Sequence, residues 1–153
     1  MTDATPLPPA DTPLGRIIAG RIAVDGPMTL GTYMGLVLGH PQHGYYTTRE
    51  PFGADGDFVT APEISQMFGE LVGLWLAVAW DEAGQPPAVT LAELGPGRGT
   101  LMADALRAMK MMPGLLDRVS LHFVEQSPRL REAQAQAVAD AGLSRPPVWH
   151  DTV

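Results

Sequence analysis

The sequence predicts an α/β protein in which a short parallel sheet follows a helical N-terminal region. Two observations carry this prediction. After Gly84, apolar runs typical of strands alternate with helical patterns; the runs cover 89–94, 119–124 and 148–150, and the helical patterns cover 100–111 and 128–141. A glycine-rich turn joins the first run to the first of these helices. Strands that alternate with helices of this length usually pair in parallel through crossover helices.

Two short amphipathic helices are predicted before residue 42. Thr12-Pro13 is typical of an N-cap and a first helical position, and Thr29 is typical of a second N-cap. His40-Pro41 is expected to end the second helix, because the residue before a proline disfavours helical geometry. Apolar residues at helical spacing follow the two caps, namely Leu14, Ile17, Ile18 and Ile22, then Leu30, Tyr33, Met34, Val37 and Leu38.

Residues 39–61 are rich in Gly, Pro, Thr and Asp, which predicts a long irregular segment with brief strands at Tyr45-Tyr46 and Phe58-Val59. A long helix is expected next, from about Pro62 to Ala83, with Thr60 and Glu63 as a capping box. Its apolar positions cover a wide face and predict a well-buried helix: Ile64, Met67, Phe68, Leu71, Val72, Trp75, Leu76 and Ala79.

The predicted organisation has three parts. Residues 1–13 form a disordered tail, residues 14–84 a helical and irregular region, and residues 85–153 a sheet region. In a right-handed doubly wound sheet whose first strand is central, the three strands take the order 3-2-1. The other edge of the first strand would then lie open, so we expect these strands to be the N-terminal half of a larger, Rossmann-like sheet that is truncated here.

Composition narrows the classes of function. The net charge of −7 offers no basic stripe for phosphates, so nucleic acid is not an expected partner. No apolar run is long enough to cross a bilayer, and no membrane insertion is expected. Without cysteine there is no thiolate chemistry. A secretory signal or a transit peptide carries basic side chains, and residues 1–15 have none. The protein is therefore expected in the cytoplasm. The oligomeric state is not predicted.

The glycine-rich turn is the main candidate for a ligand site. Gly95, Gly97 and Gly99 stand at alternate positions between a strand and a helix, where they allow a sharp turn and a close approach to a ligand. The dinucleotide fingerprint requires its third glycine three residues after the second, and Thr100 occupies that position. The pattern therefore disfavours NAD.

Acidic residues at the ends of the first two strands favour S-adenosyl-L-methionine (SAM), which carries an ammonium group and ribose hydroxyls but no pyrophosphate. Glu93 is expected to accept hydrogen bonds from the methionine ammonium, and Glu125 from the ribose hydroxyls. Alternatively, Glu125 only marks the start of the next helix. Arg98 either reaches a ligand carboxylate or points to solvent.

Several motifs in register resemble the MidA family of SAM-dependent methyltransferases, from about Leu14 to the end of the chain. The motifs are Gly26-Pro27-Met28-Thr29, His40-Pro41-Gln42-His43-Gly44-Tyr45-Tyr46, residues 56–70 from Gly56-Asp57-Phe58 to Phe68-Gly69-Glu70, and Glu93-Leu94-Gly95-Pro96-Gly97-Arg98-Gly99-Thr100. This family includes a mitochondrial factor that methylates an arginine on a subunit of respiratory complex I.

The resemblance implies a Rossmann-like methyltransferase fold and protein arginine N-methylation, with SAM as the donor and a protein as the substrate, for example a complex I subunit. Family members are about twice as long as this chain, and their acceptor-side segment has no counterpart here. An alternative is therefore a non-catalytic assembly or binding module with the donor fold, or an inactive fragment.

An acceptor guanidinium must be oriented by carboxylates, and Glu63 and Glu70 are candidates for that catalytic role. The alternative interpretation is that Glu63 only completes the capping box and that the Glu70 side chain only faces solvent. No metal site is expected, because Asp55 and Asp57 lack the later ligands of a calcium loop. His40 and His43 are interpreted as residues that shape a turn.

Overall fold

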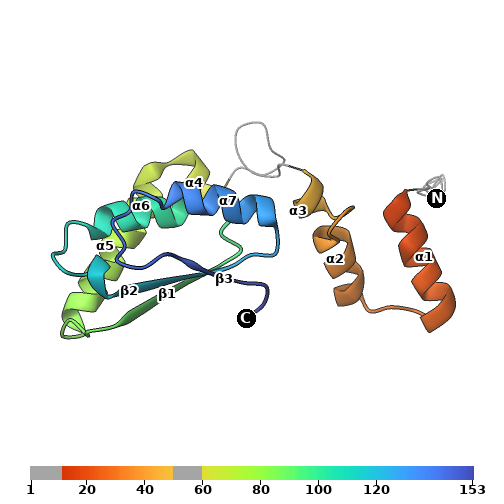
Figure 1. The fold of residues 1–153 in the computed structure, drawn as a ribbon, viewed down its shortest axis with the longest axis horizontal. Coiled ribbons are helices and arrows are strands. Elements are labelled where there is room, and N and C mark those ends of the chain that lie inside the picture. The colour runs from red at the N-terminus through yellow and green to blue at the C-terminus, as the bar shows by residue number, and fades with distance from the viewer. Residues whose placement is uncertain (1–11, 50–59) are drawn as a thin grey trace, which may run out of the picture. The chain divides into compact units, whose positions relative to one another are not determined.

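A computed structural model describes residues 12–49 and 60–153 of the chain. The chain divides into two compact units, an N-terminal unit of residues 1–49 and a sheet unit of residues 50–153 (Figure 1). The predicted region 14–84 is thus shared between the two units. The predicted disordered tail lies almost wholly outside the described residues, as do the predicted strand at Phe58-Val59 and the pair Asp55 and Asp57. Across the two described ranges, no helix is both long and apolar enough to cross a membrane.

The N-terminal unit contains helices α1 (Pro13–Asp25), α2 (Leu30–Gly39) and α3 (Tyr45–Thr48). The predicted caps of the first two helices are confirmed: the Thr12 hydroxyl accepts from the Gly15 N–H at 3.0 Å, and the Thr29 hydroxyl accepts from the Thr32 N–H at 3.1 Å. Both caps satisfy N–H groups that have no partner inside the helix.

The brief strand predicted at Tyr45-Tyr46 is wrong, because these residues begin the single helical turn α3. The hydroxyls of Thr47 and Thr48 both donate to the Gly44 carbonyl, at 2.9 and 2.7 Å. Such side-chain bonds to the backbone three or four residues earlier favour a turn over a strand.

The first helices in the described part of the sheet unit are α4 (Ala61–Ile64) and α5 (Gln66–Glu82). The single helix predicted from Pro62 to Ala83 is wrong at one point: Ser65 is extended, with φ −148° and ψ 118°, and separates the two helices. The Thr60 side chain makes no capping hydrogen bond, so the predicted capping box does not form either. The break turns α4 toward the start of α6, where Glu63 finds its partners.

Three parallel strands form the sheet, in the order β1-β2-β3, and their predicted bounds are confirmed: β1 (Val89–Leu94), β2 (Val119–Val124) and β3 (Val148–His150). Helix α6 (Thr100–Met109) connects β1 to the one-turn helix η1 (Leu116–Arg118), and α7 (Pro128–Ala137) precedes β3. Both helices end a few residues earlier than predicted. Figure 1 shows α6 and α7 above the same face of the sheet.

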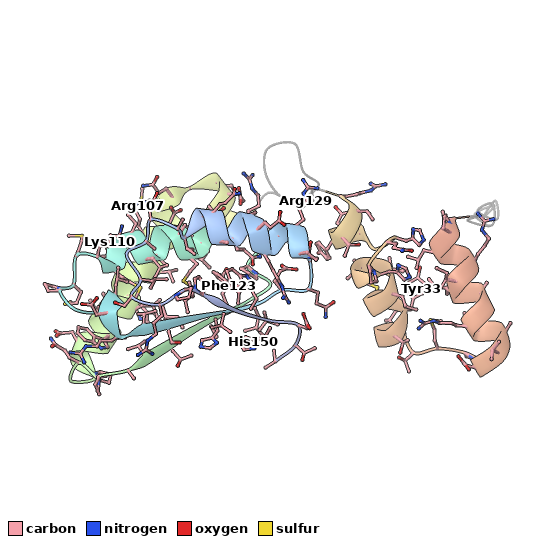
Figure 2. All side chains as sticks on the ribbon, viewed as in Figure 1. Tyr33, Arg107, Lys110, Phe123, Arg129 and His150 are labelled. Carbon is pink, nitrogen blue, oxygen red and sulfur yellow. The ribbon has the colours of Figure 1, made fainter. Side chains whose placement is uncertain are left out.

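The hydrophobic core lies between the sheet and these helices. Its fully buried centre includes Phe123 and Leu121 of β2 with Leu106 of α6, and Figure 2 shows Phe123 between the strands and the helices. Side chains alternate along β2, so that Val119, Leu121 and Phe123 face the helices while the residues between them face away. The predicted α/β class with a parallel sheet is therefore confirmed.

Helix α5 packs on α6 through its small residues. Its buried positions are Gly69, Gly73, Ala77 and Trp80. The wide buried face predicted for this helix is wrong, since many of its large apolar side chains are exposed: Met67, Phe68, Leu71, Leu74, Trp75 and Val78. Helical periodicity identified the apolar residues but could not tell that the backbone of α6 lies against the glycine side of the helix.

Candidate functional site

The glycine loop joins the end of β1 to the start of α6. Gly95, Gly97 and Gly99 have φ angles of 64°, 56° and 84°. The N–H of Gly95 donates to the Val124 carbonyl at 3.0 Å, and the N–H of Gly99 donates to the Pro96 carbonyl at 2.9 Å. The loop is therefore anchored to β2 at its start and closes in a tight turn before the helix.

The glycines of this loop have different surroundings. A Cβ added to Gly95 would meet no atom within 4 Å, whereas one added to Gly99 would lie 3.1 Å from Cα of Gln134. Gly97 is buried, and its carbonyl accepts from Nε2 of Gln134 at 2.8 Å. Gly99 thus lets α7 pack closely, while Gly95 leaves open space that a ligand can approach.

A pocket of about 210 Å³ lies between the loop and α4. This volume is below the roughly 300–1,000 Å³ of pockets that enclose a whole drug-sized ligand. The described lining residues are Thr60, Pro62, Glu63, Glu93, Gly95, Pro96, Gly97, Arg98, Thr100 and Leu101. The pocket therefore has the size for one part of a larger ligand, and it combines two carboxylates with one guanidinium.

Glu93 is the most perturbed side chain of the pocket. The alternation of β1 puts it on the same face as Val89 and Leu91, which pack against the core. Its Oε2 atom is buried and has no hydrogen-bond partner among the described residues. Burial raises the pKa of Glu93 to about 7, because the charged form loses its hydration. Within the part of the chain that the structure describes, the site thus holds one buried carboxylate oxygen that no donor reaches.

Glu63 reaches the pocket from α4. Its Oε1 accepts from the Thr100 hydroxyl at 2.7 Å, and its Oε2 lies 3.8 Å from Nη1 of Arg98. The Glu63 side chain is 16% exposed, and that of Arg98 is 48% exposed. Arg98 is thus loosely paired to Glu63 at the rim of the pocket, and Glu63 links α4 to the first residue of α6.

Glu70, the other predicted acceptor-side carboxylate, does not line this pocket. It accepts from Nε2 of Gln66 at 2.7 Å and from Nη1 of Arg107 at 3.1 Å. The hydrogen bonds from Gln66 and Arg107 lower the pKa of Glu70. Arg107 also pairs with Asp104 at 2.6 Å, so Glu70 belongs to the polar contact between α5 and α6.

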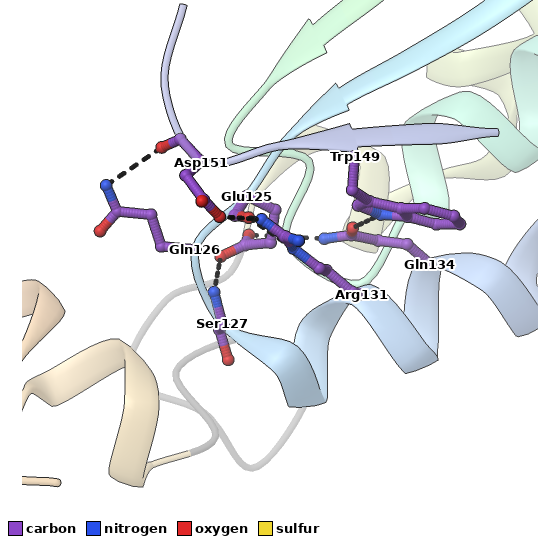
Figure 3. A network of polar contacts seen from close by, with 7 residues as sticks. All are labelled: Glu125, Gln126, Ser127, Arg131, Gln134, Trp149 and Asp151. Carbon is purple, nitrogen blue, oxygen red and sulfur yellow. Dashed lines mark hydrogen bonds and ion pairs between the residues drawn. The ribbon is translucent and has the colours of Figure 1, made fainter. Parts of the chain in front are cut away.

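Glu125 follows β2 and is held in a polar network with the start of α7 (Figure 3). Its Oε1 accepts from the Ser127 N–H at 2.8 Å, and its Oε2 from Nε2 of Gln134 at 3.4 Å. The helix-start role that the sequence left open is thus observed. A carboxylate offers about four lone-pair sites, so these two bonds do not exhaust it. Glu125 is not among the described residues that line the pocket.

Sequence reasoning missed Gln134. It stands four residues after Leu130 and four before Val138, so it occupies the apolar stripe of α7, and all three side chains are buried. A polar residue on a buried stripe must find partners, which is a signal that could have identified it. Thr100 was noted only for excluding a dinucleotide fingerprint, yet it bonds Glu63.

Metal ligands do not gather in the described parts of the chain: no group of three or more His, Cys, Asp or Glu side chains could hold an ion there. The rings of His40 and His43 stack with centroids 5.1 Å apart, and Nδ1 of His40 accepts from the Gln42 N–H at 3.2 Å. This geometry agrees with the predicted turn.

Comparison with known sequences identifies a family and several relatives of this chain. Residues 71–153 match the family described as "Putative S-adenosyl-L-methionine-dependent methyltransferase". The protein arginine methyltransferase NDUFAF7, mitochondrial, of Bos taurus is 47% identical over 131 residues, which cover 84% of this chain and 30% of that protein. The human relative of the same name is 46% identical over 126 residues, covering 81% and 29%. The chain thus spans about 30% of the length of these relatives, so the expectation that family members are about twice as long as this chain is too low.

Two crystal structures from Burkholderia thailandensis resemble the fold. The first, bound to S-adenosyl-homocysteine, superposes with a TM-score of 0.73 at 30% identity, covering 92% of this chain and 37% of that one. The second, a native structure, has a TM-score of 0.67 at 31% identity, covering 92% and 35%. Both neighbours support the α/β fold of this chain.

The predicted cytoplasmic location is contradicted, because the curated relatives are named as mitochondrial proteins. The prediction rested on the lack of basic side chains in residues 1–15 and on the lack of cysteine. A chain without cysteine suits any reducing compartment, so this property could not separate one such compartment from another.

Proposed function

The chain belongs to this family of SAM-dependent methyltransferases, and we propose that it forms the donor-binding part of a protein arginine methyltransferase of the MidA type. The observation that carries the proposal is the buried carboxylate oxygen of Glu93 beside the glycine loop, which has no hydrogen-bond partner among the described residues. The names of the curated relatives support arginine as the acceptor.

The residues present fit SAM at two points. The methionine ammonium is a cationic donor, which is the partner that Oε2 of Glu93 lacks among the described residues. The open space at Gly95 allows a ligand to lie against the backbone. A pocket smaller than a whole ligand suits the amino-acid end of SAM. When bound, SAM supplies a methyl group activated by its sulfonium.

We assign a separate role to each predicted binding residue. Glu93 binds the ammonium, and Arg98, held only at 3.8 Å from Glu63, binds the carboxylate of the same amino-acid group. Gly95 and Gly97 let the ligand approach the loop. Glu125 accepts from the ribose hydroxyls with its remaining lone pairs. Gly99 contributes indirectly, because it permits the close packing of α7.

The acceptor side of the proposal relies on Glu63. A guanidinium stays charged in proteins, so it must be oriented by a carboxylate while the nucleophile is aligned with the donor. Glu63 lines the pocket and is mostly buried, whereas Glu70 is occupied by Arg107 outside it. We therefore keep Glu63 alone as the acceptor-side candidate. The acceptor is an arginine of a protein, and a respiratory complex I subunit is the substrate that the MidA resemblance implies.

The three strands are proposed to be the N-terminal half of a larger Rossmann-like sheet with the order 3-2-1. Among the described residues, β1 pairs only with β2, so no strand lies along its other edge. An apolar strand edge that stays open invites association with other strands. Further strands beside β1 would cover this edge and complete the fold.

Calorimetric titration of the chain with SAM, S-adenosyl-homocysteine and NAD tests the donor assignment. SAM and S-adenosyl-homocysteine are expected to bind, and NAD is not, because Thr100 occupies the position where the dinucleotide fingerprint requires its third glycine. Binding of NAD without SAM, or of none of the three, would overturn the proposal.

A transfer assay separates the enzyme from the non-catalytic alternative. The chain is incubated with SAM labelled at its methyl group and with arginine-containing peptides, and the label in the peptide is counted. Incorporation into arginine supports the methyltransferase proposal. SAM binding without any incorporation favours a binding module.

Gly95→Ala is expected to weaken SAM binding at least about tenfold, a loss of ~1.4 kcal/mol, because its methyl group would fill the space proposed for the ligand. Gly84→Ala is the matched control. Both glycines have positive φ, 64° and 80°, and neither has an atom within 4 Å of an added Cβ. Both variants should therefore lose about 1–2 kcal/mol of stability to backbone strain. Equal SAM affinity in the two variants would contradict the placement of the ligand at Gly95.

A further inference from the structure

Gln134 of α7 is a fully buried amide that joins three segments at the carboxyl end of the sheet (Figure 3). Its Nε2 donates to the Gly97 carbonyl at 2.8 Å and to Oε2 of Glu125 at 3.4 Å. Its Oε1 accepts from the indole Nε1 of Trp149 at 2.8 Å. One side chain thus contacts the loop after β1, the residue after β2 and a residue of β3.

The chemistry of the partners fixes the orientation of this amide. An indole N–H only donates, so it must face the amide oxygen, and a backbone carbonyl only accepts, so it must face the amide nitrogen. Both Nε2 hydrogens are then used, one by Gly97 and one by Glu125. No other natural side chain of this length supplies two donors and one acceptor in that arrangement.

Close packing around Gln134 restricts its movement. The Cα of Gln134 would lie 3.1 Å from a Cβ on Gly99, so α7 approaches the loop as closely as a glycine permits. The buried residues four positions before and after it, Leu130 of α7 and Val138 at the end of this helix, are apolar. An apolar residue would fill this position without the desolvation cost of a buried amide, which indicates that the position requires its hydrogen bonds.

We propose that Gln134 is a positioning residue, which sets the glycine loop and the Glu125 carboxylate at a fixed separation for the adenosyl part of SAM. The inference rests on the proposed function, since it assumes that both groups contact SAM. Gln134 does not touch the reacting atoms. It acts through Gly97, which lines the pocket, and through Glu125, whose other oxygen is held by the Ser127 N–H.

The first test replaces the amide by an apolar side chain of similar length. Gln134→Met is expected to weaken binding of S-adenosyl-homocysteine at least tenfold, measured by calorimetry at a temperature where circular dichroism shows a folded chain. The Trp149 indole N–H, followed by NMR, should lose its protection from hydrogen exchange. Gln136→Met on the exposed side of the same helix is the matched control, and it should bind as the wild type does.

The second test changes only the donors. In Gln134→Glu the acceptor for Trp149 is kept, but a carboxylate faces the Gly97 carbonyl and the Glu125 carboxylate. Protonation of the new side chain restores one donor. The dissociation constant of the variant divided by that of the wild type should therefore fall as the pH is lowered from 8 to 5, while the Trp149 N–H stays protected. A purely structural role predicts a ratio that does not depend on pH.

The outcomes separate the two proposals. If the wild-type chain does not bind S-adenosyl-homocysteine, the proposed function is overturned. If the wild type binds, but both Gln134 variants bind equally well when folded, the positioning role alone is overturned. Should Gln134→Met fail to fold, the pH dependence of Gln134→Glu decides between a positioning role and a structural one.

Discussion

Glu93→Gln is expected to stabilise the chain above pH 7 and to abolish SAM binding. In the wild type, burial raises the pKa of Glu93 from 4.5 to about 7, which corresponds to about 3 kcal/mol against the charged form. A glutamine resembles the neutral carboxyl in shape and carries no charge to desolvate. It also cannot attract the methionine ammonium. One substitution should therefore act on stability and binding in opposite directions.

The pH dependence of this effect has a definite sign. The folded-state pKa of Glu93 is raised, so folding favours the protonated form. The contribution of the protonated side chain to the free energy of unfolding is fully present below pH 4.5 and is lost as the pH rises through about 7. Wild type and Glu93→Gln should thus have similar free energies of unfolding at pH 4.5, and the variant should be more stable by about 3 kcal/mol at pH 8.

Urea unfolding at several pH values, followed by tryptophan fluorescence, measures the stability difference. The matched control is Glu132→Gln, an exposed carboxylate on α7, which should shift neither stability nor binding. SAM affinity of the wild type should fall by up to about 100-fold from pH 8 to 5, because binding requires the ionised carboxylate. A Glu93→Gln variant that binds SAM normally would exclude the role we assign to Glu93.

Gly73→Ala is expected to destabilise the sheet unit by at least about 2–3 kcal/mol. An added Cβ would lie 2.2 Å from the carbonyl oxygen of Ala105 and 2.7 Å from its Cα. These are backbone atoms of α6 and cannot move aside as the end of a flexible side chain would. The methyl group therefore forces α5 away from α6, which separates the core residues Ala77 and Trp80 from their neighbours.

The control for this substitution is Gly35→Ala in α2, where an added Cβ meets no atom within 4 Å. Alanine favours a helix over glycine by up to about 1 kcal/mol, so the control should keep or increase the helical signal. Thermal unfolding by circular dichroism compares the two variants. A Gly73→Ala variant as stable as the wild type would show that α5 and α6 do not pack as described.

The elements with the strongest local signals were predicted correctly. The bounds of all three strands agree with the structure, as do the capped starts of α1 and α2. The helix predicted from residue 128 also begins there, at Pro128, where the Ser127 hydroxyl accepts from the Leu130 N–H at 3.4 Å. In each case a few adjacent residues specify the backbone, so no knowledge of the packing was required.

The errors concern residues whose partners are distant in the chain. The extended Ser65 interrupts a continuous helical pattern, and Glu63 bonds Thr100 instead of its own helix start. Which side of α5 is buried depends on the close approach of α6 to Gly69 and Gly73. The helical periodicity of apolar residues predicts a helix and its apolar positions, but it does not predict which other element packs against each side of that helix.

The glycine loop, the acidic ends of the first two strands and the family motifs were all readable from local sequence, because a sharp turn needs glycine and a strand places its last residue at the edge of the sheet. The burial and the hydrogen-bond partners of the site residues could not be read from local sequence. Within the described ranges, Oε2 of Glu93 is buried without a hydrogen-bond partner because β1 turns this side chain toward the core. The loop is linked to Glu125 because Gln134 of α7 bonds both. Burial and long-range hydrogen bonds depend on how distant segments pack, and therefore only the folded chain reveals them.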